Sequence, residues 1–184
     1  HPELLQEIRT AAMIGPMLDR TPMPQFSAGA VYDPVNSFAA WAPALLADAI
    51  AAMLMGHFYP IGLIEVDIRN GLRPVDAVSI GTEEGRYLTE PPLLVRMAAI
   101  DAVLHRTGGD YTFEAVRELR TRLELPNVLR YVMPNRVAKQ LKADALLALV
   151  EQVTDALVQE RFTALGGNRL RDFFGTGIRS ADAP

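Results

Sequence analysis

Apolar residues recur at helical spacing over most of the chain. The longest apolar stretch runs from Phe38 to Met55 and contains one charged residue, Asp48. A residue able to cap a helix, Asn36 or Ser37, precedes the stretch and Gly56 follows it, so the pattern predicts a helix. Because this helix is apolar on all sides, it must be covered by its own domain or by another subunit, and we expect an oligomer.

Four further helices are predicted from the same periodicity. They are expected within residues 1–16 and over 92–107, 112–125 and 136–165, the last one closed by Gly166 and Gly167. Their expected inward positions are Leu4, Leu5, Ile8 and Ala12, then Leu93, Met97, Ile100 and Leu104, then Phe113, Val116, Leu119 and Leu123, and finally Leu146, Val150, Val153 and Leu157. The last set fits packing in a helical bundle and a dimer interface equally well.

The pattern changes between residues 61 and 80. Two runs of β-branched residues flank Asn70 and Gly71, a dipeptide that favours the tight turn of a β-hairpin. A βα unit is the alternative, because the second run precedes a loop and a helix. The expected fold is therefore mainly α, of the α+β class, with a small two- or three-stranded β element at about 61–80.

Length and composition predict one domain. Of 184 residues, 49% are apolar and 22% are charged, which is typical of a single folded unit. We divide the chain into an N-terminal helix at 1–16, a long loop or arm at 17–36, a core at 37–177 and a frayed tail at 178–184. A loop as long as 17–36 is usually a lid, a binding loop or an arm that wraps a partner, and a plain connector is the alternative.

The absence of cysteine excludes disulfides and thiolate metal sites. It favours a reducing compartment, so we expect a soluble, cytoplasmic protein. The apolar stretch at 38–55 is not predicted to cross a membrane, because its length barely reaches the span of a bilayer and Pro43 and Asp48 interrupt it.

Three carboxylates are candidate metal ligands. In the hairpin register, Glu65 lies opposite Asp76 with Asp67 on the same face. Like charges that face each other need neutralising, either by Arg69 and Arg73 or by a divalent cation, which prefers oxygen ligands. The second choice predicts a metal-dependent enzyme acting on a phosphate-bearing or other small anionic substrate. The sequence assigns no specific cofactor.

Asp101 and His105 are the candidate catalytic residues. They are four residues apart on the predicted 92–107 helix, a spacing that lets a carboxylate orient an imidazole for general acid–base chemistry. A cationic histidine near the C-terminus of a helix is also favoured by the helix dipole alone. Since the helix is otherwise largely apolar, its polar residues Arg96 and Asp101 should have partners.

Cations outnumber acids between residues 115 and 142. Glu118 and Glu124 are the acids of this segment, and Glu118 is expected to pair with Arg122 one helical turn away. Such a basic surface could contact phosphates, or it could be a solvated, salt-linked face. The candidate anion-binding residues are Arg117, Arg120, Arg122, Arg136, Lys139 and Lys142, with Arg130 in the same segment.

The surplus of apolar helix gives the first functional expectation. It is a non-catalytic helical subunit or assembly protein that binds a protein partner or itself. Two alternatives stay open. One is the metal-dependent enzyme of the 61–80 carboxylates, and the other is a nucleic-acid binder that uses the basic segment.

Overall fold

The structure, a computed structural model, describes residues 2–8, 10, 34–80, 90–107, 114–131, 139–170 and 172. The arm predicted at 17–36 lies outside these residues except for its last three, which are helical. The predicted tail at 178–184 and Arg136 also lie outside the described residues.

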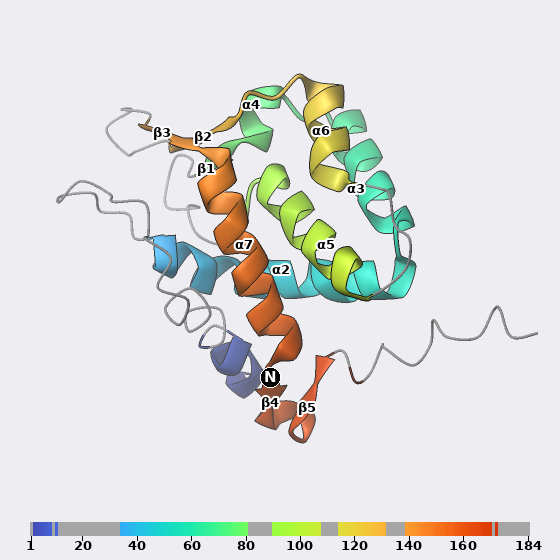
Figure 1. Cartoon of the computed structure of the whole chain (residues 1–184), viewed down its shortest axis with the longest axis vertical. Coiled ribbons are helices and arrows are strands. Elements are labelled where there is room, and N and C mark those ends of the chain that lie inside the picture. The colour runs from blue at the N-terminus through green and yellow to red at the C-terminus, as the bar shows by residue number, and fades with distance from the viewer. Residues whose placement is uncertain are drawn as a thin grey trace, which may run out of the picture.

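Helices form most of the described chain, as the sequence predicts (Figure 1). Beyond a helical segment at residues 2–8, they are α2 (Pro34–Met55), α3 (Phe58–Arg69), α4 (Pro74–Ala77), α5 (Leu93–Thr107), α6 (Ala115–Leu123) and α7 (Ala143–Gln159). α5 packs against α2, α6 and α7, and α2 crosses behind α5 and α7 in Figure 1. In the described part of the chain, no helix combines the length and the hydropathy needed to span a bilayer.

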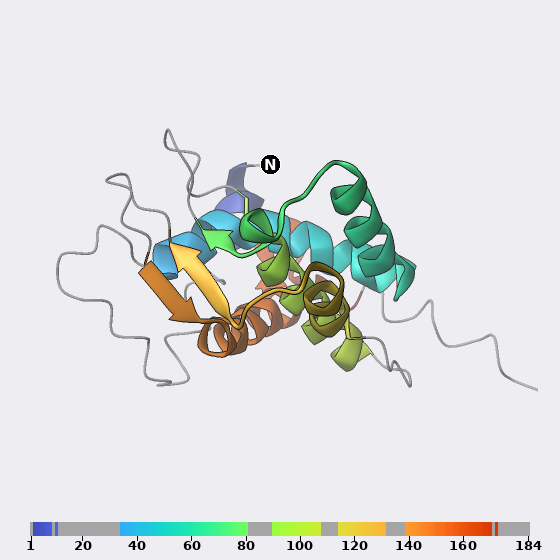
Figure 2. The ribbon, with the colours of Figure 1, turned by 90° about the horizontal axis from the view of Figure 1, so that it is seen from above.

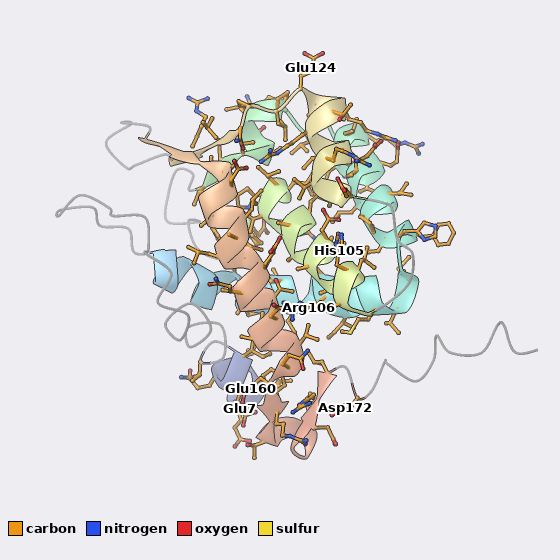
Figure 3. All side chains as sticks on the ribbon, in the orientation of Figure 1. Glu7, His105, Arg106, Glu124, Glu160 and Asp172 are labelled. Carbon is orange, nitrogen blue, oxygen red and sulfur yellow. The ribbon has the colours of Figure 1, made fainter. Side chains whose placement is uncertain are left out.

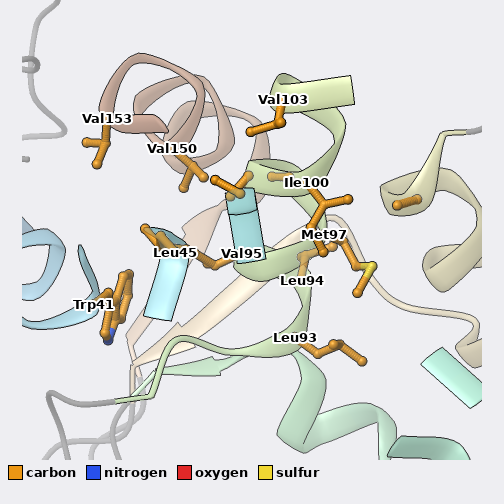
Figure 4. Packing of buried hydrophobic residues seen from close by; sticks show 14 of the residues in the cluster. Trp41, Leu45, Leu93, Leu94, Val95, Met97, Ile100, Val103, Val150 and Val153 are labelled. Carbon is orange, nitrogen blue, oxygen red and sulfur yellow. The ribbon is translucent and has the colours of Figure 1, made fainter. Parts of the chain in front are cut away.

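The core lies where α2, α5 and α7 meet (Figure 4). Trp41 and Leu45 of α2 pack into the same cluster as Ile100 of α5 and Val150 of α7, all of them buried. Every inward position predicted for α5 and for α7 is buried, which confirms both helical stripes. The α7 stripe therefore packs within the bundle of its own chain.

The N-terminal helical segment packs against the core, as expected for an amphipathic helix. Ile8 is buried in the core, and Glu7 Oε2 accepts a hydrogen bond from the backbone N–H of Ala164 at 3.3 Å. Leu5, however, is exposed rather than inward-facing, because it lies on the outer side of this helix.

Two small sheets complete the fold. β1 (Ser79–Ile80), β2 (Val128–Tyr131) and β3 (Lys139–Lys142) form a sheet in that order, with β1 parallel to β2 and β2 antiparallel to β3 (Figure 2). β4 (Arg161–Phe162) and β5 (Asn168–Arg169) pair antiparallel around the 3₁₀ helix η1 (Thr163–Leu165). Gly166 and Gly167 turn the chain there with φ of 68° and 77°, a backbone region that favours glycine.

The hairpin predicted at 61–80 is wrong. Most of this segment is α3 and α4, and only Ser79–Ile80 is a strand. Gly71 has a φ of 82°, and its N–H bonds to the carbonyl of Ile68 while the N–H of Leu72 bonds to that of Asp67. These two bonds form a Schellman motif, in which a glycine ends a helix with the same positive φ that a hairpin turn requires. The βα alternative is correct in part, since β1 precedes α5 and pairs parallel with β2.

Helix boundaries also differ from the prediction, and α6 covers Ala115–Leu123 rather than 112–125. α2 begins at Pro34, before Asn36, and a proline is well suited to the first turn of a helix because its missing N–H is not needed there. The helix predicted at 136–165 is α7 alone, with β3 before it and the β4–β5 hairpin after it. Gly166 and Gly167 close that hairpin and do not end the helix.

Candidate functional site

Exposed apolar side chains lie at the end of α2 and along α3. Phe58 is 67% exposed and Leu54 is 65% exposed, although both are large and apolar. Apart from Leu5, every large hydrophobic side chain that is exposed in the described part of the chain belongs to α2 or α3. We name them the α2–α3 apolar surface: Leu54, Met55, Phe58, Ile61 and Val66.

The turn between the two helices creates this surface. Gly56 has a φ of 59°, its N–H bonds to the carbonyl of Ala52, and α3 starts two residues later. The tight turn brings the last residues of α2 beside the first turn of α3, at the edge of the molecule in Figure 1. Pro60 and Ile64 form the buried side of α3, which leaves Phe58 on the outer side.

A buried ion pair holds α3 in place. Asp48 of α2 is 1% exposed and receives two hydrogen bonds from the Arg96 guanidinium of α5, from Nε at 2.8 Å and from Nη2 at 2.7 Å. The hydroxyl of Tyr59, from α3, donates to the same carboxylate at 2.6 Å. Burial, followed by this bond to Asp48, raises the pKa of Tyr59 to about 12. The network joins three helices and confirms that Arg96 has a partner.

The predicted metal ligands do not come together, because the hairpin that would have gathered them is absent. Glu65 pairs with Arg122 of α6, whose hydrogen bond lowers the pKa of the Glu65 carboxyl. Asp76 forms a bidentate pair with Arg73 at 2.7 and 2.9 Å, which lowers the pKa of Asp76. Burial raises the pKa of Asp67. In the described ranges, no three His, Cys, Asp or Glu side chains lie close enough together to hold a metal ion.

A cleft of about 630 Å³ lies between α5, α6 and α7. Its apolar lining comes from Ala98, Ala102, Val116 and Leu147, and small alanine side chains leave room above α5. The polar lining consists of Asp101, His105, Arg106, Glu114, Arg117, Arg120, Thr121 and Glu151. Figure 3 shows His105 and Arg106 on the C-terminal half of α5. The structure therefore brings the candidate catalytic pair together with Arg117 and Arg120, two of the candidate anion-binding residues.

Asp101 and His105 do not bond to each other through their side chains. The Asp101 carboxylate accepts hydrogen bonds from the backbone N–H groups of Ala115 at 2.7 Å and of Val116 at 2.9 Å, and so caps the start of α6. Burial raises the pKa of Asp101, and these two hydrogen bonds oppose the rise. His105 Nδ1 lies 2.7 Å from the backbone carbonyl of Asp101, so Nδ1 carries the proton and Nε2 is left for other partners.

The described arginines of α6 lie beside acids. Arg117 is 3.3 Å from Glu114, and Arg120 is 3.6 Å from Asp144. Arg122 bonds to Glu118 at 2.7 Å, which confirms the predicted pair, and also reaches Glu65. Lys139 and Lys142 belong to β3, and Arg130 belongs to β2.

Sequence reasoning missed Phe58, Tyr59 and Ile61 as functional or structural residues. Phe58 lies outside every predicted element, and Ile61 is assigned to a strand. A signal is nevertheless present in the sequence. Phe58 and Ile61, which follow Gly56, are three residues apart, and residues at this spacing lie on one face of a helix.

No protein-family model matches the chain, and comparisons with curated proteins and with solved structures found no match. Two sites thus carry the functional argument, the α2–α3 apolar surface and the cleft between α5, α6 and α7.

Proposed function

We propose that this protein is a non-catalytic helical assembly protein, which binds a second copy of itself through the α2–α3 apolar surface. One observation supports the proposal above all. The large exposed hydrophobic side chains of the described chain, Leu5 excepted, lie at the end of α2 and along α3. Apolar side chains gathered in this way are typical of a protein–protein contact, and an exposed aromatic ring such as Phe58 is a frequent anchor of such contacts.

The outer side of α3 is suited to a second copy. Gly62 is exposed there, and a Cβ added to it would meet nothing within 4 Å. Phe58 lies one turn before Gly62 and Val66 one turn after it, so these three residues form one row along the helix. Two antiparallel copies that cross at Gly62 would place Phe58 of each beside Val66 of the other, and the bare glycines would let the backbones approach closely.

The support beneath α3 favours this role as well. The Asp48–Arg96 pair and the Tyr59 hydroxyl fix α3 on α2 and α5, and Arg122 fixes it on α6 through Glu65. A surface held rigidly before binding loses less entropy when it binds.

Sedimentation equilibrium at micromolar concentrations tests the proposal. We expect a dimer for the wild type, and for Phe58→Glu a dissociation constant at least about tenfold higher, because a charge would be buried in the contact. Leu5→Glu is the matched control, since Leu5 is also exposed but lies on the N-terminal helical segment. Circular dichroism checks that each variant is folded. A monomeric wild type would contradict self-association. Equal dissociation constants for all three proteins would show that the α2–α3 apolar surface is not the contact.

The two other functions suggested by the sequence have weaker geometric support. The metal-dependent enzyme depended on the hairpin register, which the structure replaces with α3 and α4. The nucleic-acid binder depended on an excess of cations, whereas Arg120 lies beside Asp144 and Arg122 bonds to both Glu118 and Glu65.

A further inference from the structure

The cleft between α5, α6 and α7 has walls of opposite charge. On one wall, α6 contributes Arg117 and Arg120 with the single acid Glu114 at its start, and on the other, α7 contributes Glu151. Glu151 is exposed and forms no hydrogen bond or ion pair with another described residue. Between the walls lie four apolar side chains, from Ala98 and Ala102 of α5, Val116 of α6 and Leu147 of α7.

The charges already in the cleft argue against a simple anion as its ligand. Each of the three arginines that line it already lies beside an acid: Arg106 beside Asp155, Arg117 beside Glu114 and Arg120 beside Asp144. An anion alone would therefore gain little net attraction, while Glu151 can still bond to a cationic group. A molecule with both charges, separated by an apolar body, matches the two walls and the lining between them.

We propose that the cleft binds a short apolar peptide with free termini, a zwitterion. Its carboxylate bonds to the Arg117 guanidinium, its ammonium group bonds to the Glu151 carboxylate, and its side chains contact Ala98, Ala102, Val116 and Leu147. The volume of about 630 Å³ falls within the range of about 300 to 1,000 Å³ that is usual for small-molecule sites. This site does not depend on the α2–α3 apolar surface, which lies on other helices.

The existing pair of Arg117 does not block the site. Arg117 lies 3.3 Å from Glu114, and the two side chains are 68% and 48% exposed. Ion pairs between exposed side chains contribute little to stability, so a ligand carboxylate can replace Glu114 at small cost. The Asp101 carboxylate, by contrast, is occupied with the N–H groups at the start of α6 and keeps that wall in position.

Isothermal titration calorimetry with leucyl-leucine tests the proposal, and free leucine shows whether a single amino acid is enough. N-acetylated and C-amidated leucyl-leucine each lack one charge, and we expect each to bind at least about tenfold more weakly than the free peptide. Glu151→Gln and Arg117→Gln should cause a loss of the same size. Arg122→Gln and Glu160→Gln are the matched controls, because Arg122 lies on the same helix as Arg117 but outside the cleft, and Glu160 directly follows the helix that holds Glu151.

A third variant, Ala102→Leu, fills the cleft without changing its charge and should also abolish binding, with circular dichroism as the check on folding. The proposal is overturned if leucyl-leucine does not bind at millimolar concentration, or if free leucine binds more tightly than leucyl-leucine. It is equally overturned if the blocked peptides bind as well as the free one, or if Glu151→Gln and Arg117→Gln bind as the controls do. Phe58→Glu should bind the peptide normally, so failure of this site and failure of self-association are separate results.

Discussion

Replacing Arg96 by methionine tests whether the buried ion pair stabilises the fold as the structure indicates. Methionine keeps much of the length and apolar stem of arginine but removes the guanidinium. The Asp48 carboxylate, 1% exposed, would lose both hydrogen bonds from Arg96 and keep only the one from Tyr59. Removing one partner of a buried pair typically costs about 3 to 5 kcal/mol. Because Arg96 is 27% exposed and water reaches that side of the pair, we expect about 3 kcal/mol.

The reverse variant, Asp48→Asn, should cost less. Its amide oxygen can still accept a hydrogen bond from Arg96 or Tyr59, and the partly exposed guanidinium can bind water in place of the lost acceptor. We therefore expect a loss of about 1 to 2 kcal/mol. The double variant should lose less than the sum of the two single losses, since neither partner is then left charged and unpaired.

Urea unfolding followed by circular dichroism measures all three free energies. The expected order of destabilisation is Arg96→Met above Asp48→Asn. The reasoning is refuted if Arg96→Met lowers the unfolding free energy by less than about 1 kcal/mol, or by less than Asp48→Asn does. Either result would mean that the Asp48 carboxylate is not left buried and unpaired in Arg96→Met. A strictly additive double variant would show that the two side chains do not interact.

Three further predictions concern single residues. Glu124, at the end of α6 (Figure 3), has a φ of 49°, a backbone region that favours glycine. Glu124→Gly should therefore raise the unfolding free energy by about 0.5 to 1 kcal/mol, whereas Glu124→Ala should not. Equal urea midpoints for the two variants would contradict this expectation. Ultraviolet titration should show one tyrosine that ionises near pH 12 and that Tyr59→Phe removes. Because the pKa of Tyr59 is raised from 10.0, the stability that Tyr59 contributes is complete below pH 10 and is lost as the pH rises through about 12. A wild-type titration curve with no tyrosine ionisation near pH 12 would disprove the raised pKa. Asp101→Asn should lower the unfolding free energy by about 1 kcal/mol, because a single amide oxygen replaces the two carboxylate oxygens that accept from the N–H groups of Ala115 and Val116. An unchanged thermal midpoint would show that Asp101 does not cap α6.

Helical stripes are the part of the fold that the sequence predicts well. Ile100, Val150 and their neighbours are buried as expected, because the 3.6-residue repeat is written in adjacent residues and needs no knowledge of the partner helix. The hairpin predicted for residues 61–80 is wrong for the opposite reason. Asn70 and Gly71 can form either a hairpin turn or a Schellman motif, and only the packing of Ile64 and Pro60 against the core decides between them.

Strand pairing lies beyond a local pattern of this kind. Ser79 pairs with Arg130 across a separation that contains two helices, and neither short strand has an alternation long enough to be recognised alone. The sequence predicts a helix in place of β3, because Lys139–Lys142 continues directly into α7 and contains good helix formers. Its pairing with β2 supplies the backbone hydrogen bonds that outweigh this local preference.

The candidate sites show the same division between local and long-range information. The sequence predicts that Arg96 and Asp101 need partners, because a charge in an apolar helix is costly when unpaired. It does not reveal the partners themselves, Asp48 in α2 and the backbone at the start of α6.

Once these partners are known, the arrangement of both sites follows. Arg96 fixes α3 against α2, which leaves Phe58 on the outside, and Asp101 fixes α6 against α5, which places Arg117 across the cleft from α7. The polar residues that interrupt the apolar stripe of α5 thus position the two surfaces from which we infer function.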